Sequence, residues 1–176
     1  MIFALLCGLL GLGGAVFLIK QVIALPTGNE RMLQIAGAIQ EGAKAYLNRQ
    51  IVTIGAIAAV IFLLLWIFRD FSTAAGFVLG AICSLSAGYI GMRVAVLANV
   101  RTAQGAILNR KSALQAAFNG GAVTGLLVVG LALLSGGIFW LLMSWINGDK
   151  SIASLVGVAL GASLISVFAR LGGGIY

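Results

Sequence analysis

Long stretches without charged residues follow one another along the chain. Each is about as long as the 20 apolar residues that cross a bilayer, and their apolar positions do not alternate as they would in a strand. Only helices and closed barrels satisfy the backbone inside lipid, so the pattern predicts helices. The expected fold is an all-α, polytopic transmembrane helix bundle forming a single region over residues 1–176. The five helices are expected approximately at residues 2–25, 28–68, 71–99, 112–146 and 151–171.

The second of these helices begins with a segment of a different kind. Between residues 27 and 50, apolar positions recur at helical spacing and polar residues occupy the other face. Thr27 and Glu30 have the spacing of a capping box, and no proline interrupts the path into the apolar stretch. We therefore expect one long helix, amphipathic outside the bilayer and apolar within it. Its polar half either lies on the lipid headgroups or packs on a cytoplasmic part of the same protein.

Composition and charge agree with a membrane protein. Hydrophobic residues make up 61% of the chain and charged residues 9%, against about 25% charged residues in soluble domains. The net charge of +7 does not indicate nucleic-acid binding, because the basic residues are dispersed between apolar runs. Nine lysines and arginines fall on one side of the predicted topology and two on the other. The positive-inside rule then places the N-terminus outside and the C-terminal end of this chain in the cytoplasm.

Glycines occur repeatedly at a spacing that suits helix packing in lipid. Three pairs have it: Gly76 and Gly80, Gly121 and Gly125, and Gly157 and Gly161. Small residues four apart let two backbones approach closely, so a tightly packed bundle is expected.

The chain lacks the groups that most reactions need. It has four acidic residues, none deep in a predicted span, and no histidine. Cys7 and Cys83 lie within apolar runs and are expected to be packing residues. We assign no catalytic residue and no metal ligand. Arg170 remains, at the end of the last span, with Ser163 and Ser166 on its helical face. It either snorkels to the interface or belongs to one wall of an ion path.

Four segments of the chain are distinctive: "IAGAIQEGAKAYLNRQ" (35–50), "GYIGMRVAVLANVRTA" (88–103), "GGAVTGLLVVGL" (120–131) and "LGASLISVFARLGGGIY" (160–176). They closely resemble the N-terminal part of membrane-bound, ion-pumping inorganic pyrophosphatases. One departure is Gly105, in place of an expected alanine, which we place in a loop. The resemblance implies that the chain forms the first five of about sixteen transmembrane helices of a homodimeric pump. Such a pump hydrolyses pyrophosphate with Mg²⁺ as cofactor and exports H⁺ or Na⁺ from a prokaryotic cell. The resemblance does not decide whether K⁺ is a second cofactor.

The same resemblance assigns roles to a few residues. Arg170 matches an arginine of the coupling region that faces a carboxylate on the sixth helix, and Ser163 a position facing the ion gate. Gly172, Gly173 and Gly174 match the turn into the substrate funnel. No residue matches a ligand of pyrophosphate or Mg²⁺, so this fragment alone is expected to be inactive. The alternatives are a small non-catalytic membrane subunit or transporter component, and a small transporter or channel of its own.

Overall fold

The chain folds into long α-helices, as the apolar runs predict. The computed structural model describes residues 2–147, 155–163 and 166. The four long helices are α1 (Ile2–Ala24), α2 (Glu30–Phe68), α3 (Phe71–Leu108) and α4 (Arg110–Asn147). Residues 155–163 are also helical and are called the fifth segment below. Each of α1 to α4 is long and apolar enough to cross a membrane, and the described residues contain no strand. The all-α membrane bundle is therefore confirmed.

The start of α2 differs from the expected capping box at Thr27. Gly28 has a φ of +87°, which a residue with a side chain rarely adopts, so the chain turns there and the helix begins after it. Asn29 is the N-cap, and its side chain accepts a hydrogen bond of 3.0 Å from the backbone N–H of Met32. From Glu30 the helix runs unbroken to Phe68, about 58 Å.

The turn between α3 and α4 is tighter than expected. We predicted that the third helix would end near residue 99, but α3 continues to Leu108 because nothing before Asn109 breaks it. Asn109 alone separates the helices, and its side chain accepts a 2.8 Å hydrogen bond from Ser112 N–H. Gly105 lies in α3 and not in a loop. A Cβ there would lie 2.9 Å from the backbone nitrogen of Ala113, so its lack of a side chain permits this close turn.

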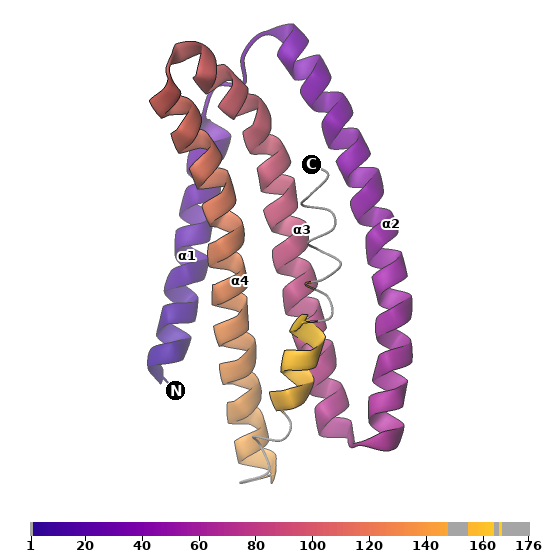
Figure 1. Ribbon diagram of the computed structural model, residues 1–176. Helices are drawn as coiled ribbons and strands as arrows, with labels where there is room; N and C mark the ends of the chain where they lie inside the picture. The colour runs from indigo at the N-terminus through magenta and orange to yellow at the C-terminus, as the bar shows by residue number, and fades with distance from the viewer. Residues whose placement is uncertain (1, 148–154, 164–165, 167–176) are drawn as a thin grey trace.

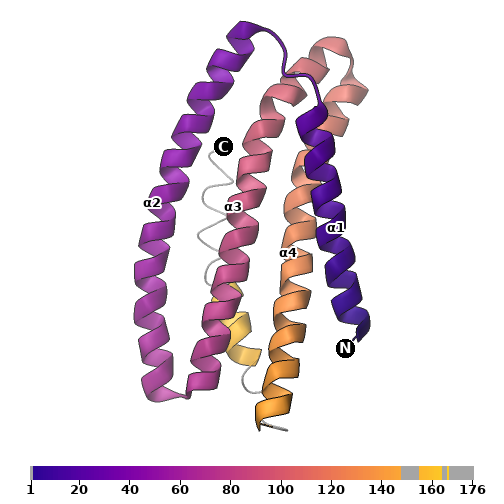
Figure 2. The same cartoon turned by 180° about the vertical axis from the view of Figure 1, so that it is seen from behind.

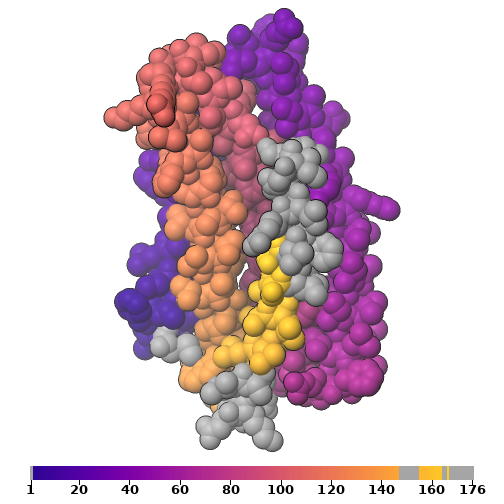
Figure 3. Space-filling view, in the orientation of Figure 1, coloured from indigo at the N-terminus to yellow at the C-terminus, as the bar shows by residue number. Residues whose placement is uncertain are grey.

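The helices lie side by side in the order α1, α4, α3, α2 (Figures 1 and 2). The main core forms where α1, α3 and α4 meet, around Ala15, Val22, Val94, Val123 and Leu127. α2 lies at one edge and packs on α3 alone among the long helices. The fifth segment is seated over α3, between α4 and α2 (Figure 3).

The two ends of the bundle differ in charge. One end holds the α1–α2 connection and the α3–α4 turn, and we call it the basic end. The opposite end holds the α2–α3 turn, where Arg69 is followed by Asp70, the N-cap of α3. The described cations toward the basic end are Lys20, Arg31, Lys44, Arg49, Arg93, Arg101, Arg110 and Lys111.

Candidate functional site: an intramembrane cavity

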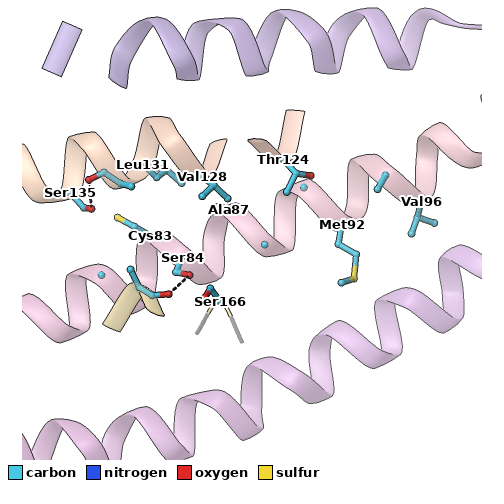
Figure 4. Close-up of a pocket in the computed structure, with 16 residues that line it drawn as sticks. Cys83, Ser84, Ala87, Met92, Val96, Thr124, Val128, Leu131, Ser135 and Ser166 are labelled. Carbon is cyan, nitrogen blue, oxygen red and sulfur yellow. Dashed lines mark hydrogen bonds between the residues drawn. The ribbon is translucent and has the colours of Figure 1, made fainter. Parts of the chain in front are cut away.

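A cavity of about 740 Å³ lies between α3, α4 and the fifth segment (Figure 4). Small residues of α3, among them Gly80, Ala87 and Gly91, form one wall, and Val128 and Leu131 of α4 form the opposite wall. The side chains that carry a hydroxyl or thiol in its lining are Cys83, Ser84, Thr124, Ser135 and Ser166.

Glycines bring the fifth segment into backbone contact with α3. A Cβ at Gly157 would collide with the carbonyl oxygen of Thr73, and one at Gly161 with that of Phe77. Gly80 faces the fifth segment in return, since a Cβ there would collide with the carbonyl oxygen of Val158. Gly157 and Gly161, one of the three glycine pairs noted in the sequence, therefore pack on the stretch of α3 that contains Gly80. Small residues allow this close helix packing in lipid.

The third pair has a different environment. Around Gly121 and Gly125 of α4, a Cβ would meet no atom of the described residues within 4 Å. This face of α4 is open in the part of the chain that the structure describes.

The polar groups of the cavity are largely bonded to the backbone. Ser84 Oγ donates a 3.0 Å hydrogen bond to the carbonyl of Ala162, and this bond ties α3 to the fifth segment (Figure 4). Ser135 Oγ donates to the carbonyl of Ala132 at 3.1 Å, and Ser166 Oγ donates to that of Ser163 at 2.8 Å. None of the described lining residues is charged. The cavity as described can line an apolar or hydrated passage, but it holds no group that exchanges protons near neutral pH.

The predicted site residues fall in different places. Ser166 lines the cavity, whereas Ser163 is exposed and is not part of its lining, although its carbonyl holds the Ser166 hydroxyl. Arg170 and Gly172, Gly173 and Gly174 lie outside the described residues. Their assigned roles therefore stay predictions.

One buried cation was not singled out from the sequence. Arg101 of α3 is only 9% exposed. Its Nη1 donates to the carbonyl of Leu97 at 2.7 Å, and its Nη2 donates to the carbonyl of Ile23 at 3.2 Å. Its Nε is buried without a hydrogen-bond partner in the described chain. Ile23 lies in the last turn of α1, whose carbonyls lack partners within the helix and attract positive charge. Arg101 thus fastens the end of α1 to α3.

The residues that the structure describes do not fit a Mg²⁺ site. The described part of the chain contains no group of three or more His, Cys, Asp or Glu side chains that could hold a metal ion. Glu30 and Glu41 are about 16 Å apart along α2. Asp70 is at the opposite end, where its carboxylate accepts bonds of 2.7 Å and 3.0 Å from the backbone N–H and the hydroxyl of Thr73.

Known proteins similar to this chain are ion pumps. The chain is 49% identical over 173 residues to a "K(+)-insensitive pyrophosphate-energized proton pump" of Methanosarcina mazei, covering 97% of this chain and 25% of that protein. It is 42% identical over 175 residues to a "putative K(+)-stimulated pyrophosphate-energized sodium pump" of Clostridium tetani, covering 99% of this chain and 25% of that protein. A K(+)-stimulated sodium pump of Thermotoga maritima is 38% identical over 186 residues, which cover 96% of this chain.

These relatives are much longer proteins, since the chain spans about a quarter of their length. The family described as inorganic H⁺ pyrophosphatase matches residues 9–176, which is nearly the whole chain. The chain therefore belongs to the family of inorganic H⁺ pyrophosphatases.

Proposed function

We propose that this chain is the N-terminal part of a pump that couples hydrolysis of Mg-pyrophosphate to export of H⁺ or Na⁺ across a membrane. The observation that carries the proposal is the family match over residues 9–176, with relatives named as pyrophosphate-energised pumps. In this proposal the ligands of pyrophosphate and Mg²⁺ come from other parts of the pump. The relatives include proton and sodium pumps, both K⁺-insensitive and K⁺-stimulated, so neither the ion nor a need for K⁺ is assigned.

The proposed orientation places the basic end in the cytoplasm of a prokaryotic cell, at its inner membrane. Eight of the described cations lie toward that end, and only Arg69 lies at the other. This segregation supports the assignment, because lysines and arginines near the membrane favour the cytoplasmic side. We further propose, from the family resemblance, that the complete pump is a homodimer.

Within the pump, α3 would hold the fifth segment in place. Glycine contacts and the Ser84–Ala162 hydrogen bond fix that segment on α3. We propose that Ser163 and Arg170 belong to the ion path and the coupling region, and that Gly172 to Gly174 form the turn toward the substrate funnel. The chain then contributes packing and part of the ion path, but not the hydrolytic site.

Co-expression tests whether the chain assembles with a pump. The chain, carrying an affinity tag, is produced together with the remaining three quarters of the Methanosarcina mazei pump, and Mg-dependent release of phosphate from pyrophosphate is measured on the purified material. We expect the two parts to co-purify and to hydrolyse pyrophosphate, whereas the chain alone releases none.

Two results would contradict the proposal. Hydrolysis by the purified chain alone would show that the catalytic groups lie within it. Stable accumulation of the chain without any co-purification would favour the alternative, a small non-catalytic membrane subunit.

A further inference from the structure

A second cavity, of about 360 Å³, opens between α2 and α3 toward the basic end. The polar side chains in its lining are Gln40, Glu41 and Lys44 from α2, and Tyr89 and Arg93 from α3. Its floor is apolar and contains the buried side chains of Ala43, Leu47 and Val96. We call it the α2–α3 cleft. It is separate from the intramembrane cavity described above, although Val96 lines both.

The charges of the cleft favour an anion. Lys44 and Arg93 come from different helices, and both are exposed. The guanidinium carbon of Arg93 lies 5.6 Å from the centre of the Tyr89 ring, so the ring face holds this side chain at the cleft. Among the described lining residues Glu41 is the one acid, and it leaves them with a net charge of +1. In the described chain neither cation forms an ion pair with an acidic residue. A phosphodiester, with one negative charge and oxygens that only accept hydrogen bonds, complements this set.

The depth of the cleft matches the lipid headgroups. α2 carries no charge from Gln50 to Phe68, about 28 Å, and α3 carries none from Phe71 to Met92, about 33 Å. Both lengths are close to the roughly 30 Å of a bilayer's hydrocarbon core. Arg93 therefore lies at its edge, and Lys44 is about 10 Å beyond Ile51 along α2. The cleft between them is at the level of the phosphates.

Apolar surface continues from the cleft into the bilayer. Directly below it, α2 and α3 meet closely around Leu47, Ile54 and Met92. Deeper, an apolar groove of about 470 Å³ opens between Phe62 of α2 and Phe77 and Ile82 of α3. We call this line of contact between α2 and α3 the α2–α3 seam. A molecule with a phosphate in the cleft and acyl chains along the seam would meet polar side chains at its head and apolar side chains at its tail. A soluble phosphate would use only the upper part.

We propose that the α2–α3 cleft binds the phosphate of an anionic phospholipid, with Lys44 and Arg93 on its oxygens and the acyl chains lying along the α2–α3 seam. A bound lipid would hold the peripheral helix α2 against α3, its one partner among the long helices. This proposal depends on the chain spanning a membrane and not on the pump function.

Lipid retention by the purified chain tests the proposal. The 176-residue chain is incorporated into nanodiscs of mixed phosphatidylglycerol and phosphatidylcholine, then extracted into detergent, and bound lipids are counted by native mass spectrometry. We expect phosphatidylglycerol to be retained in preference. The double variant Lys44→Gln/Arg93→Gln should lose on the order of tenfold in that preference, because it removes the two cations that would bond directly to the phosphate oxygens in the cleft.

A matched variant separates the cleft from general surface charge. Arg31→Gln/Arg110→Gln removes two exposed cations of the basic end that do not line the cleft, and should change the preference by no more than about twofold. Glu41→Gln, which raises the net charge of the cleft, should increase the preference for phosphatidylglycerol. This gain remains informative if the double variant fails to fold.

Three outcomes would overturn the proposal. Equal losses in the two double variants would indicate a diffuse charge effect. Displacement of the lipid by millimolar inorganic phosphate would indicate a site for a soluble anion. Finally, a photoreactive group at Ile82 in the assembled pump that captures a pump peptide and no lipid would show that a protein helix covers the seam.

Discussion

At the scale of single residues, the buried cation Arg101 shows what the sequence could and could not reveal. In the sequence it appears as one of several topological charges. Yet it continues a row of buried positions on α3 spaced alternately by four and three residues, the spacing of a helix face that packs on its neighbours. The row consists of Ala87, Gly91, Val94, Ala98, Arg101 and Gly105. The spacing therefore predicts that Arg101 is buried, whereas its acceptor, the carbonyl of Ile23, depends on how α1 is placed.

We predict that Arg101→Ala destabilises the bundle. The substitution removes the hydrogen bonds to Leu97 and Ile23 and leaves a hole at the end of α1. Hydrogen bonds from a charged donor each contribute roughly 1.5–3 kcal/mol. Because the variant no longer has to desolvate the guanidinium, the net loss in the free energy of unfolding is expected to be about 2 kcal/mol. Thermal unfolding of the purified chain in detergent, followed by circular dichroism, measures it.

Arg110→Ala is the control, because Arg110 is exposed at the start of α4. Its effect should stay within about 0.5 kcal/mol. If Arg101→Ala unfolded at the same temperature as the unsubstituted chain, the fastening role of Arg101 would be wrong.

At the scale of helices, the number and character of the elements could be predicted, but their ends and partners could not. Uninterrupted apolar runs are sufficient to predict helices in lipid, and they predicted the membrane helix bundle. The tight turn at Asn109, which Gly105 permits, could not be predicted, because a helical glycine that faces a backbone looks like any other glycine in a sequence. The glycine pairs showed that close packing exists, and only the structure shows that Gly157 and Gly161 face α3 while Gly121 and Gly125 face no described atom.

We predict opposite effects of alanine at these two kinds of glycine. Gly157→Ala places a Cβ against the backbone carbonyl of Thr73. Backbone atoms cannot move aside as a flexible side chain can, so the substitution should lower the free energy of unfolding by about 1–3 kcal/mol. Gly121→Ala meets open space and should be neutral, or stabilising by up to about 1 kcal/mol, since alanine favours helix more than glycine does. Unfolding temperatures of both variants, in the same detergent, give the comparison. Equal stability of the two variants would contradict the glycine contact between the fifth segment and α3.

At the scale of the whole molecule, the chain is a membrane helix bundle that belongs to a family of longer proteins. Its bundle has a core of its own around α1, α3 and α4, yet it spans only about a quarter of its relatives. The described residues that line the candidate cavity carry no charge, so a path for ions through it would need charged or titratable groups from elsewhere. Composition and loop charge indicated a membrane protein, but they could not indicate its substrate. The expectation of pyrophosphate as the substrate came from long sequence segments that resemble a known family.

We have proposed that this chain supplies the N-terminal quarter of a pyrophosphate-driven pump. The most direct measurement uses a chimera in which the chain replaces the corresponding quarter of the Methanosarcina mazei proton pump. The chimera is reconstituted into sealed vesicles with pyrophosphate and Mg²⁺ outside, and the internal pH is followed. We expect pyrophosphate-dependent acidification of the vesicle interior that a protonophore abolishes. A chimera that is folded and inserted but neither hydrolyses pyrophosphate nor moves ions would contradict it.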